Sequence, residues 1–179
     1  MVALGLTLVA APAAATIVEA LSLAALVDGA DHVLLVTCEA ERTHRDDRRR
    51  IVTDYDVRVE EVMKGGASTG DHLTVRRLGG EMGDLGMRIE GEPRLVPGGR
   101  YVVFLRAMDG GISRPVGMSQ GVLPVLEEAG VATVQPGGAG LSLVRRGSAG
   151  GLVPAQAALQ VPEPWDRLRG RVAAIIGGR

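Results

Sequence analysis

Apolar residues recur with two different periods along this chain, and these periods separate the expected strands from the expected helices. Over residues 51–63 apolar side chains alternate with charged ones, which is typical of a half-buried β-strand. The alternation slips at residues 60–61, and one extra residue reverses the faces of all later side chains, so we expect a β-bulge there. Residues 100–106 are apolar at odd and even positions alike, which predicts a central strand buried on both faces.

Shorter apolar runs separated by glycine predict the remaining strands. Residues 42–50 are polar and are expected to form a hairpin loop. Residues 136–151 are rich in glycine and are expected to form a loop or an irregular hairpin. We expect the other strands at 33–41, 72–78, 112–117, 121–127 and 130–135.

Helical periodicity occurs only near the two ends of the chain. Ser22 can cap a short helix that runs to about Asp28. After two prolines, a helix is expected at 163–176, where Trp165 and Leu168 belong to one apolar stripe. Because helices do not alternate with strands, a parallel α/β sheet is disfavoured. The pattern predicts a mainly β fold, either a small closed barrel or a sandwich, with short helices at the N- and C-terminal ends.

Length and charge narrow the class of protein. A chain of 179 residues is typical of one domain, and its net charge of −1 gives no basic surface for nucleic acid or anionic lipid. One tryptophan, two tyrosines and one phenylalanine are too few for base-stacking platforms. We therefore expect no nucleic-acid partner.

The first fifteen residues resemble a secretory signal peptide. Residues 1–15 are uncharged, and an apolar run is followed by small residues that suit cleavage after Ala13 or Ala15. A positively charged start is missing, so an apolar N-terminal strand or helix is the alternative. We predict an exported protein, periplasmic or secreted, whose mature domain at 16–179 has no transmembrane span. The single cysteine, Cys38, allows no internal disulfide and is expected to be a buried thiol.

No motif of an enzyme or a metal site accompanies this pattern. The three histidines, His32, His44 and His72, are far apart in sequence, and we interpret them as solvated or capping residues. Residues 117–121 have the composition G-x-S-x-G, but a strand rather than a helix is expected to follow, so we interpret them as a turn. We predict no catalytic residue, no metal site and no cofactor.

The segment 79–94 is the strongest candidate for a functional site. Its sequence, GGEMGDLGMRIEGEPR, is rich in glycine and in charge, and loops held by a rigid scaffold often carry function. A phosphate site is disfavoured, because the glycines alternate with acids and no helix follows. A cation or a basic partner fits better, and a purely structural β-hairpin is the alternative. The candidate binding residues are Glu81, Asp84, Arg88, Glu90 and Glu92.

Four motifs in order resemble a group of uncharacterised exported bacterial β-domain proteins. The motifs are ADHVLLV at 30–36, IVTDYDVRVEEVMKG at 51–65, GGEMGDLG at 79–86 and GEPRLVPGGRYVVFL at 91–105. A more distant similarity, through residues 30–33, 64–65 and 98–101, is to the netrin-like barrel of tissue inhibitors of metalloproteinases. This second resemblance implies an OB-like closed barrel. It does not imply that family's inhibitory mechanism, which needs an N-terminal cysteine to chelate the protease zinc.

Together these observations favour an exported binding or accessory module without catalytic activity. Its partner is expected to be a protein or a small ligand outside the cytoplasm that contacts residues 79–94. Two alternatives remain open, a protease inhibitor with a netrin-like barrel and a hydrolase whose site the sequence does not reveal. A deep pocket with convergent polar groups would favour the hydrolase.

Overall fold

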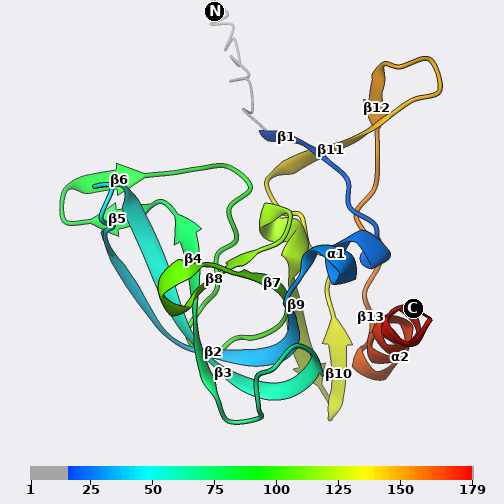
Figure 1. Ribbon diagram of the computed structural model, residues 1–179, viewed down its shortest axis with the longest axis horizontal. Helices are drawn as coiled ribbons and strands as arrows, with labels where there is room; N and C mark the ends of the chain where they lie inside the picture. Colours follow the sequence, from blue (N-terminus) through cyan, green and yellow to red (C-terminus); the bar gives the residue numbers. More distant parts are fainter. Residues whose placement is uncertain (1–15, 179) are drawn as a thin grey trace, which may run out of the picture.

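The computed structural model describes residues 16–178, so the predicted signal peptide lies outside the described residues. The described part is mainly β, with one helix near each end (Figure 1). This confirms the predicted class. Neither helix is long and apolar enough to cross a membrane. The elements are β1 (Thr16–Glu19), α1 (Leu23–Gly29), β2 (His32–Arg45), β3 (Ile51–Lys64), β4 (His72–Leu78), β5 (Gly80–Met82), β6 (Leu85–Met87), β7 (Arg100–Ala107), β8 (Ile112–Pro115), β9 (Val122–Glu128), β10 (Val131–Val134), β11 (Leu141–Arg146), β12 (Leu152–Pro154), β13 (Glu163–Pro164) and α2 (Trp165–Gly177), with 3-10 turns at Asp109–Gly111 and Met118–Gly121.

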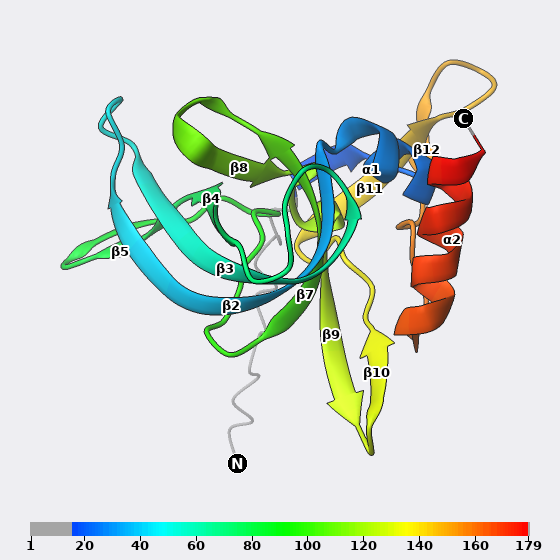
Figure 2. The ribbon, with the colours of Figure 1, turned by 60° about the horizontal axis from the view of Figure 1, so that its bottom comes forward.

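Five of these strands pair edge to edge in a closed ring (Figure 2). The order is β2, β3, β4, β8 and β7, and β7 returns to β2. The β4–β8 pairing is parallel, and the others in the ring are antiparallel. One edge of β7 pairs with β2. Its other edge pairs with β8 at one end and with β9 at the other, so the sheet branches at β7 and continues through β9 to β10 and β13.

Two hydrophobic cores lie on the two faces of β2 and β7. Alternate residues of β7 lie in different cores. Val103 and Leu105 lie in the core inside the ring, and Val102 and Phe104 lie in the core beneath the helices. All four are fully buried, which confirms the predicted two-faced strand. The ring core contains Leu34, Val36, Cys38, Tyr55, Val57, Val59, Val75, Leu95, Tyr101, Val103, Leu105 and Val122. The helix core joins β2, β7, β9 and β10 to Leu23, Leu26 and Val27 of α1 and to Trp165, Leu168 and Val172 of α2.

The long β2–β3 pair contains the predicted bulge and others that were not predicted. Leu35 lies opposite Glu61 but Val36 lies opposite Val59, so Glu60 is the extra residue. This is the position where the alternation slips in the sequence. A second irregularity lies on β2, where the register shifts between Cys38 and Ala40.

Several element boundaries differ from the expected ones. Strand β2 continues to Arg45, so the hairpin loop is shorter than the predicted 42–50. Strand β1 was not predicted, and it pairs in parallel with β11, which lies in the segment expected to be a loop or irregular hairpin. Helix α2 begins at Trp165, two residues after the predicted start, because Glu163 and Pro164 pair with β10 as β13.

Helix α1 is fixed at both of its ends. At its start, Ser22 Oγ accepts a hydrogen bond of 3.1 Å from the Ala25 N–H, as expected of a cap. At its end, Lys64 Nζ donates to Val27 O at 2.7 Å and to Ala30 O at 2.6 Å. An ammonium group stabilises carbonyls that have no partner within the helix. The single lysine of the chain therefore joins the end of β3 to α1.

Candidate functional site

The glycine-rich segment 79–94 starts from a fixed point on the ring. Thr53 Oγ1, which is buried in β3, donates a hydrogen bond of 2.7 Å to Gly79 O. The next residue, Gly80, has a φ of 144°, and a Cβ there would overlap the side chains of Thr43 and Thr53. Glycine is thus required where the chain leaves β4 and passes close to the ring.

After this anchor the segment forms a short hairpin and then an irregular stretch. Strands β5 and β6 pair around a tight turn, so part of the segment is a hairpin, although not one long hairpin. The stretch that follows is tied down by Thr16 Oγ1, which donates to Glu90 O at 2.9 Å, and by the Ser119 N–H, which donates to Gly91 O at 2.9 Å. The base of the segment is therefore held at several points, while the β5–β6 hairpin projects from the ring (Figure 1).

A hollow of about 840 Å³, which we call the loop hollow, lies beneath this segment. Its walls come from the ring, from the β5–β6 hairpin, from the irregular stretch and from the turn before β11. It is lined by Glu41, Arg77, Gly80, Glu81, Gly86, Met87, Arg88, Ile89, Glu90, Gly91, Glu92, Arg94, Ala139 and Gly140. The lining is strongly charged, with acidic and basic side chains interspersed.

The five predicted site residues do not all share one environment. Glu81 is exposed at the hollow, and Asp84 is exposed at the hairpin turn outside it. Neither makes an ion pair or a side-chain hydrogen bond within residues 16–178. Arg88 forms an ion pair of 2.5 Å with Glu90, and the two side chains are 85% and 33% exposed.

Glu92, the fifth predicted residue, is turned inward. Its side chain is only 6% exposed and forms an ion pair of 3.1 Å with Arg114. It also accepts a hydrogen bond of 3.3 Å from the Leu78 N–H. Burial raises the pKa of the Glu92 carboxyl above its ordinary value, although Arg114 acts in the opposite direction. A desolvated carboxylate in a cleft is a common feature of functional sites.

Arg77 and Tyr55 connect the loop hollow to the ring core. Arg77 Nε donates to the Tyr55 hydroxyl at 2.7 Å, and the guanidinium lies 6.0 Å from the centre of the tyrosine ring. Tyr55 itself is fully buried in the ring core, where burial raises the pKa of its hydroxyl. This wall of the hollow therefore rests on packed core residues and should move little when a ligand binds.

The two nucleophiles considered in the sequence are structural. Ser119 is buried in a 3-10 turn, and its Oγ donates to Ala139 O at 2.9 Å, as expected of a turn residue. Cys38 is fully buried in the ring core, which confirms the prediction of a buried thiol. Burial, followed by repulsion from Glu41, raises the pKa of the Cys38 thiol to about 11. A protonated, enclosed thiol is a poor nucleophile.

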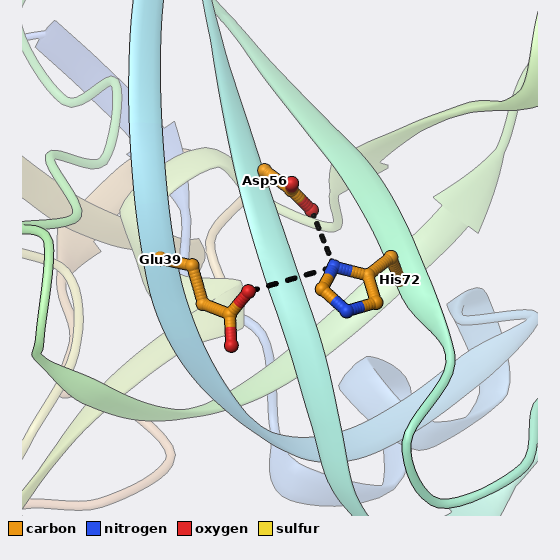
Figure 3. A group of neighbouring side chains, drawn as sticks. All are labelled: Glu39, Asp56 and His72. Atoms are coloured by element: carbon orange, nitrogen blue, oxygen red, sulfur yellow. Dashed lines mark hydrogen bonds and ion pairs between the residues drawn. The ribbon is translucent and has the colours of Figure 1, made fainter.

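A second group of side chains, which the sequence did not reveal, lies on the outer face of the ring. Glu39 of β2, Asp56 of β3 and His72 of β4 point toward one another (Figure 3). We call these three residues the outer-face cluster. His72 Nδ1 lies 3.1 Å from Asp56 Oδ1 and 3.6 Å from Glu39 Oε2. Only the pairing of three strands brings the residues together, so no local spacing in the sequence could have indicated them.

Other carboxylates on this outer face are occupied by arginine. Both oxygens of Asp54 accept hydrogen bonds from Arg76, at 2.6 and 2.7 Å, and His44 Nε2 lies 2.8 Å from Oδ2. Both oxygens of Glu60 lie within 3.3 Å of nitrogen atoms of Arg100. Burial alone would raise the pKa of these two carboxyls, but the hydrogen bonds outweigh it and lower both pKa values.

Within residues 16–178, the fold and these two sites are the features from which function can be argued. Comparison of the chain with family models, with curated proteins and with solved structures finds no match in any of the three.

Proposed function

We propose that this protein is an exported, non-catalytic binding module whose ligand occupies the loop hollow. The observation that carries the proposal is the hollow of about 840 Å³ bordered by a charged, glycine-rich segment with a fixed base. A segment that is already ordered loses little conformational entropy when it binds, so more of the contact energy appears as affinity. The export part of the proposal rests on the sequence of residues 1–15.

The scaffold of the proposed module is a small OB-like barrel. Three observations support this: five strands pair in a closed ring, the ring contains one parallel contact between β4 and β8, and both helices lie outside the ring core. Barrels of this type bind ligands through loops and a sheet face. Because one fold serves many functions, the ligand has to be argued from the site itself.

Charge favours a basic segment of another protein as the ligand. Arg88 and Glu90 neutralise each other, and Glu92 is paired with Arg114. Glu41 and Glu81 line the hollow without an ion pair within residues 16–178, and so do Arg77 and Arg94, although Arg77 is held by the Tyr55 hydroxyl. Asp84 adds a further exposed carboxylate at the hairpin turn. Three carboxylates without an ion pair therefore face two such arginines, and the excess of one negative charge favours encounter with lysine- or arginine-bearing partners.

The composition of the lining favours binding over catalysis. The residues that line the loop hollow include no serine, threonine, cysteine or histidine. Hydrolysis through a hydroxyl, thiol or imidazole nucleophile requires such a residue with an adjacent base. Carboxylates are then the only acids or bases available at the hollow, and Glu92 among them is fixed by Arg114.

The proposal is tested with the triple variant Glu81→Ala, Asp84→Ala, Arg88→Ala. The matched control is Asp109→Ala, Glu128→Ala, Arg146→Ala, which removes the same charges from exposed positions outside the hollow. Each substitution should change the free energy of unfolding by no more than about 0.5 kcal/mol, because the side chains are on the surface. Binding to an array of lysine- and arginine-rich peptides, and capture of native partners from the envelope fraction, should fall only for the loop variant.

The opposite result would identify segment 79–94 as scaffold. A loop variant with a lower melting temperature, whose folded fraction binds peptides and partners as well as the control does, contradicts the proposal. Equal losses in both triple variants would also contradict it, because they would indicate binding through general surface charge.

A further inference from the structure

We propose that Glu39, Asp56 and His72 bind a divalent transition-metal ion, of the zinc or manganese class, on the outer face of the ring. Of the residues 16–178, these are the only three whose potential metal-binding atoms gather closely, all within 4.8 Å of one another. The site is separate from the loop hollow and does not depend on its proposed function.

The two distances from His72 to the carboxylates are close to those between neighbouring ligands of a bound metal ion. With metal–ligand bonds of about 2.0–2.2 Å, neighbouring ligand atoms lie about 3.0 Å apart in an octahedron and about 3.4 Å apart in a tetrahedron. His72 Nδ1 is 3.1 Å from Asp56 Oδ1 and 3.6 Å from Glu39 Oε2. A metal ion can therefore enter with small rotations of exposed side chains and without movement of the backbone.

The fold brings the three ligands together through a bulge. His72 lies opposite Arg58 and Asp56 lies opposite Ala40 in the register of neighbouring strands. On β2 the register shifts between Cys38 and Ala40, and Glu39 is the extra residue. Bulges often redirect side chains at functional sites. Here the bulge leaves Glu39 and Ala40 both exposed, and Figure 3 shows the Glu39 carboxylate directed across the face toward His72.

Arg58 orients the Glu39 carboxylate without blocking it. Arg58 Nε donates a hydrogen bond of 2.8 Å to Glu39 Oε1, which leaves Oε2 directed toward His72. Hydrogen bonds from outer groups commonly fix the orientation of metal ligands in this way. Arg58 contributes one positive charge against two carboxylates, so one net negative charge remains to attract a divalent ion.

The surroundings leave room for further ligands on the metal. His72, Asp56 and Glu39 are 51%, 52% and 37% exposed, so water can complete the coordination shell. Asp56 and His72 also line a hollow of about 460 Å³ that extends along the face to Asp54. Three protein ligands with open positions are typical of exchangeable or reactive metal sites, in contrast to closed structural sites with four protein ligands. One imidazole with two carboxylates suits zinc or manganese.

The experiment is calorimetric titration of the untagged full chain with zinc chloride and, separately, with manganese chloride. We expect one ion per chain. His72→Gln and Asp56→Asn should each weaken binding by at least about tenfold, and Glu39→Gln should act in the same direction. In nitrogen-15 spectra of the imidazoles, zinc should shift Nδ1 of His72 and leave Nε2 protonated.

His44→Gln is the matched control, because it removes a histidine that contacts an aspartate on the same face. Arg76 already occupies both oxygens of that aspartate, Asp54, so the pair has no carboxylate oxygen to offer a metal. The control should bind zinc as the unmodified chain does, and all variants should keep its melting temperature without metal. Absence of binding, or equal binding by His72→Gln and the unmodified chain, overturns the proposal.

Discussion

Carboxylates on the outer face of the ring and beneath the glycine-rich segment are held in opposite ways. On the outer face, Asp54 and Glu60 each accept hydrogen bonds from an arginine through both oxygens, and their pKa values are lowered. Beneath the segment, Glu92 is more enclosed, and burial raises its pKa despite the ion pair with Arg114. The outer face thus stabilises the ionised forms of Asp54 and Glu60, whereas the ionised form of Glu92 in the loop hollow lowers the stability of the fold.

This difference separates groups that stabilise the fold from groups that a ligand could use. A carboxylate satisfied by two strong hydrogen bonds gains little from a new partner, whereas a desolvated one gains more from a cation brought close to it. The carboxylates of the outer-face cluster are held less tightly than that of Asp54. Glu39 and Asp56 each accept few hydrogen bonds, and both are exposed. The cluster's carboxylates remain available, in contrast to that of Asp54.

Both regions are built on the same ring of strands, which contains β7. The largest expected effect on stability comes from disrupting this strand. Phe104 of β7 is fully buried in the helix core. Phe104→Ala should lower the free energy of unfolding by about 3–5 kcal/mol, because it removes a buried aromatic ring and leaves a cavity. Urea unfolding followed by circular dichroism measures the loss. A loss below about 1 kcal/mol would mean that β7 is not the central element of the scaffold.

The next effect tests whether the outer face stabilises its acids. Asp54→Asn should lower the free energy of unfolding by about 1.5–3 kcal/mol, because Arg76 loses charge-assisted hydrogen bonds at a site where the carboxylate is 10% exposed. Asp47→Asn on the exposed β2–β3 turn is the control and should change little. If both variants unfold at the same urea concentration, the Asp54–Arg76 pair does not stabilise the fold.

The smallest effect is the most specific, and it concerns pH. The folded protein holds a proton on Glu92 at higher pH than the unfolded chain does, so ionised Glu92 opposes folding. Glu92→Gln should therefore equal or exceed the unmodified chain in stability at neutral pH, within about 1 kcal/mol, because Arg114 is 35% exposed and can be hydrated without its partner. This advantage should shrink as the pH falls through the raised pKa of Glu92 toward 4.5, the ordinary value.

Asp54 should show the opposite pH dependence. Its pKa is lowered in the folded protein, so its contribution is complete above the ordinary value of 3.8 and is lost as the pH falls through the folded pKa. Thermal unfolding of both variants and the unmodified chain from neutral to acidic pH gives the two slopes. Parallel slopes for Glu92→Gln and Asp54→Asn would remove the distinction between the two regions.

The sequence predicted those elements in which a local pattern determines the environment. Strict alternation located β3 and the bulge at Glu60, and the two-sided apolar run located β7. The stripe through Trp165 and Leu168 predicted the side of α2 that is buried. For the glycine-rich segment, a β-hairpin was one of two interpretations, and the structure contains a short hairpin in which Gly80 and Gly83 have positive φ.

What the sequence could not predict depends on contacts between distant segments. Glu39 and His72 are far apart in the chain, and their proximity requires the register of three strands and a bulge that no alternation marks. The inward orientation of Glu92 depends on its ion pair with Arg114 of β8, which lies 22 residues further along the chain. Strand β1 gains its pairing from β11, and four residues on their own carry too little pattern to predict a parallel strand.

The position of Lys64 makes its amine a chemical reporter of how often α1 separates from the end of β3. Beyond the α-amino group, a chain with one lysine offers amine-reactive reagents a single side chain to modify. While α1 is docked, that amine is hydrogen-bonded to two carbonyl oxygens and is a weak nucleophile. Its acylation rate therefore follows the fraction of molecules in which α1 has separated from β3. Mass spectrometry of the labelled chain can thus measure helix undocking in a mixture, even inside a cell extract.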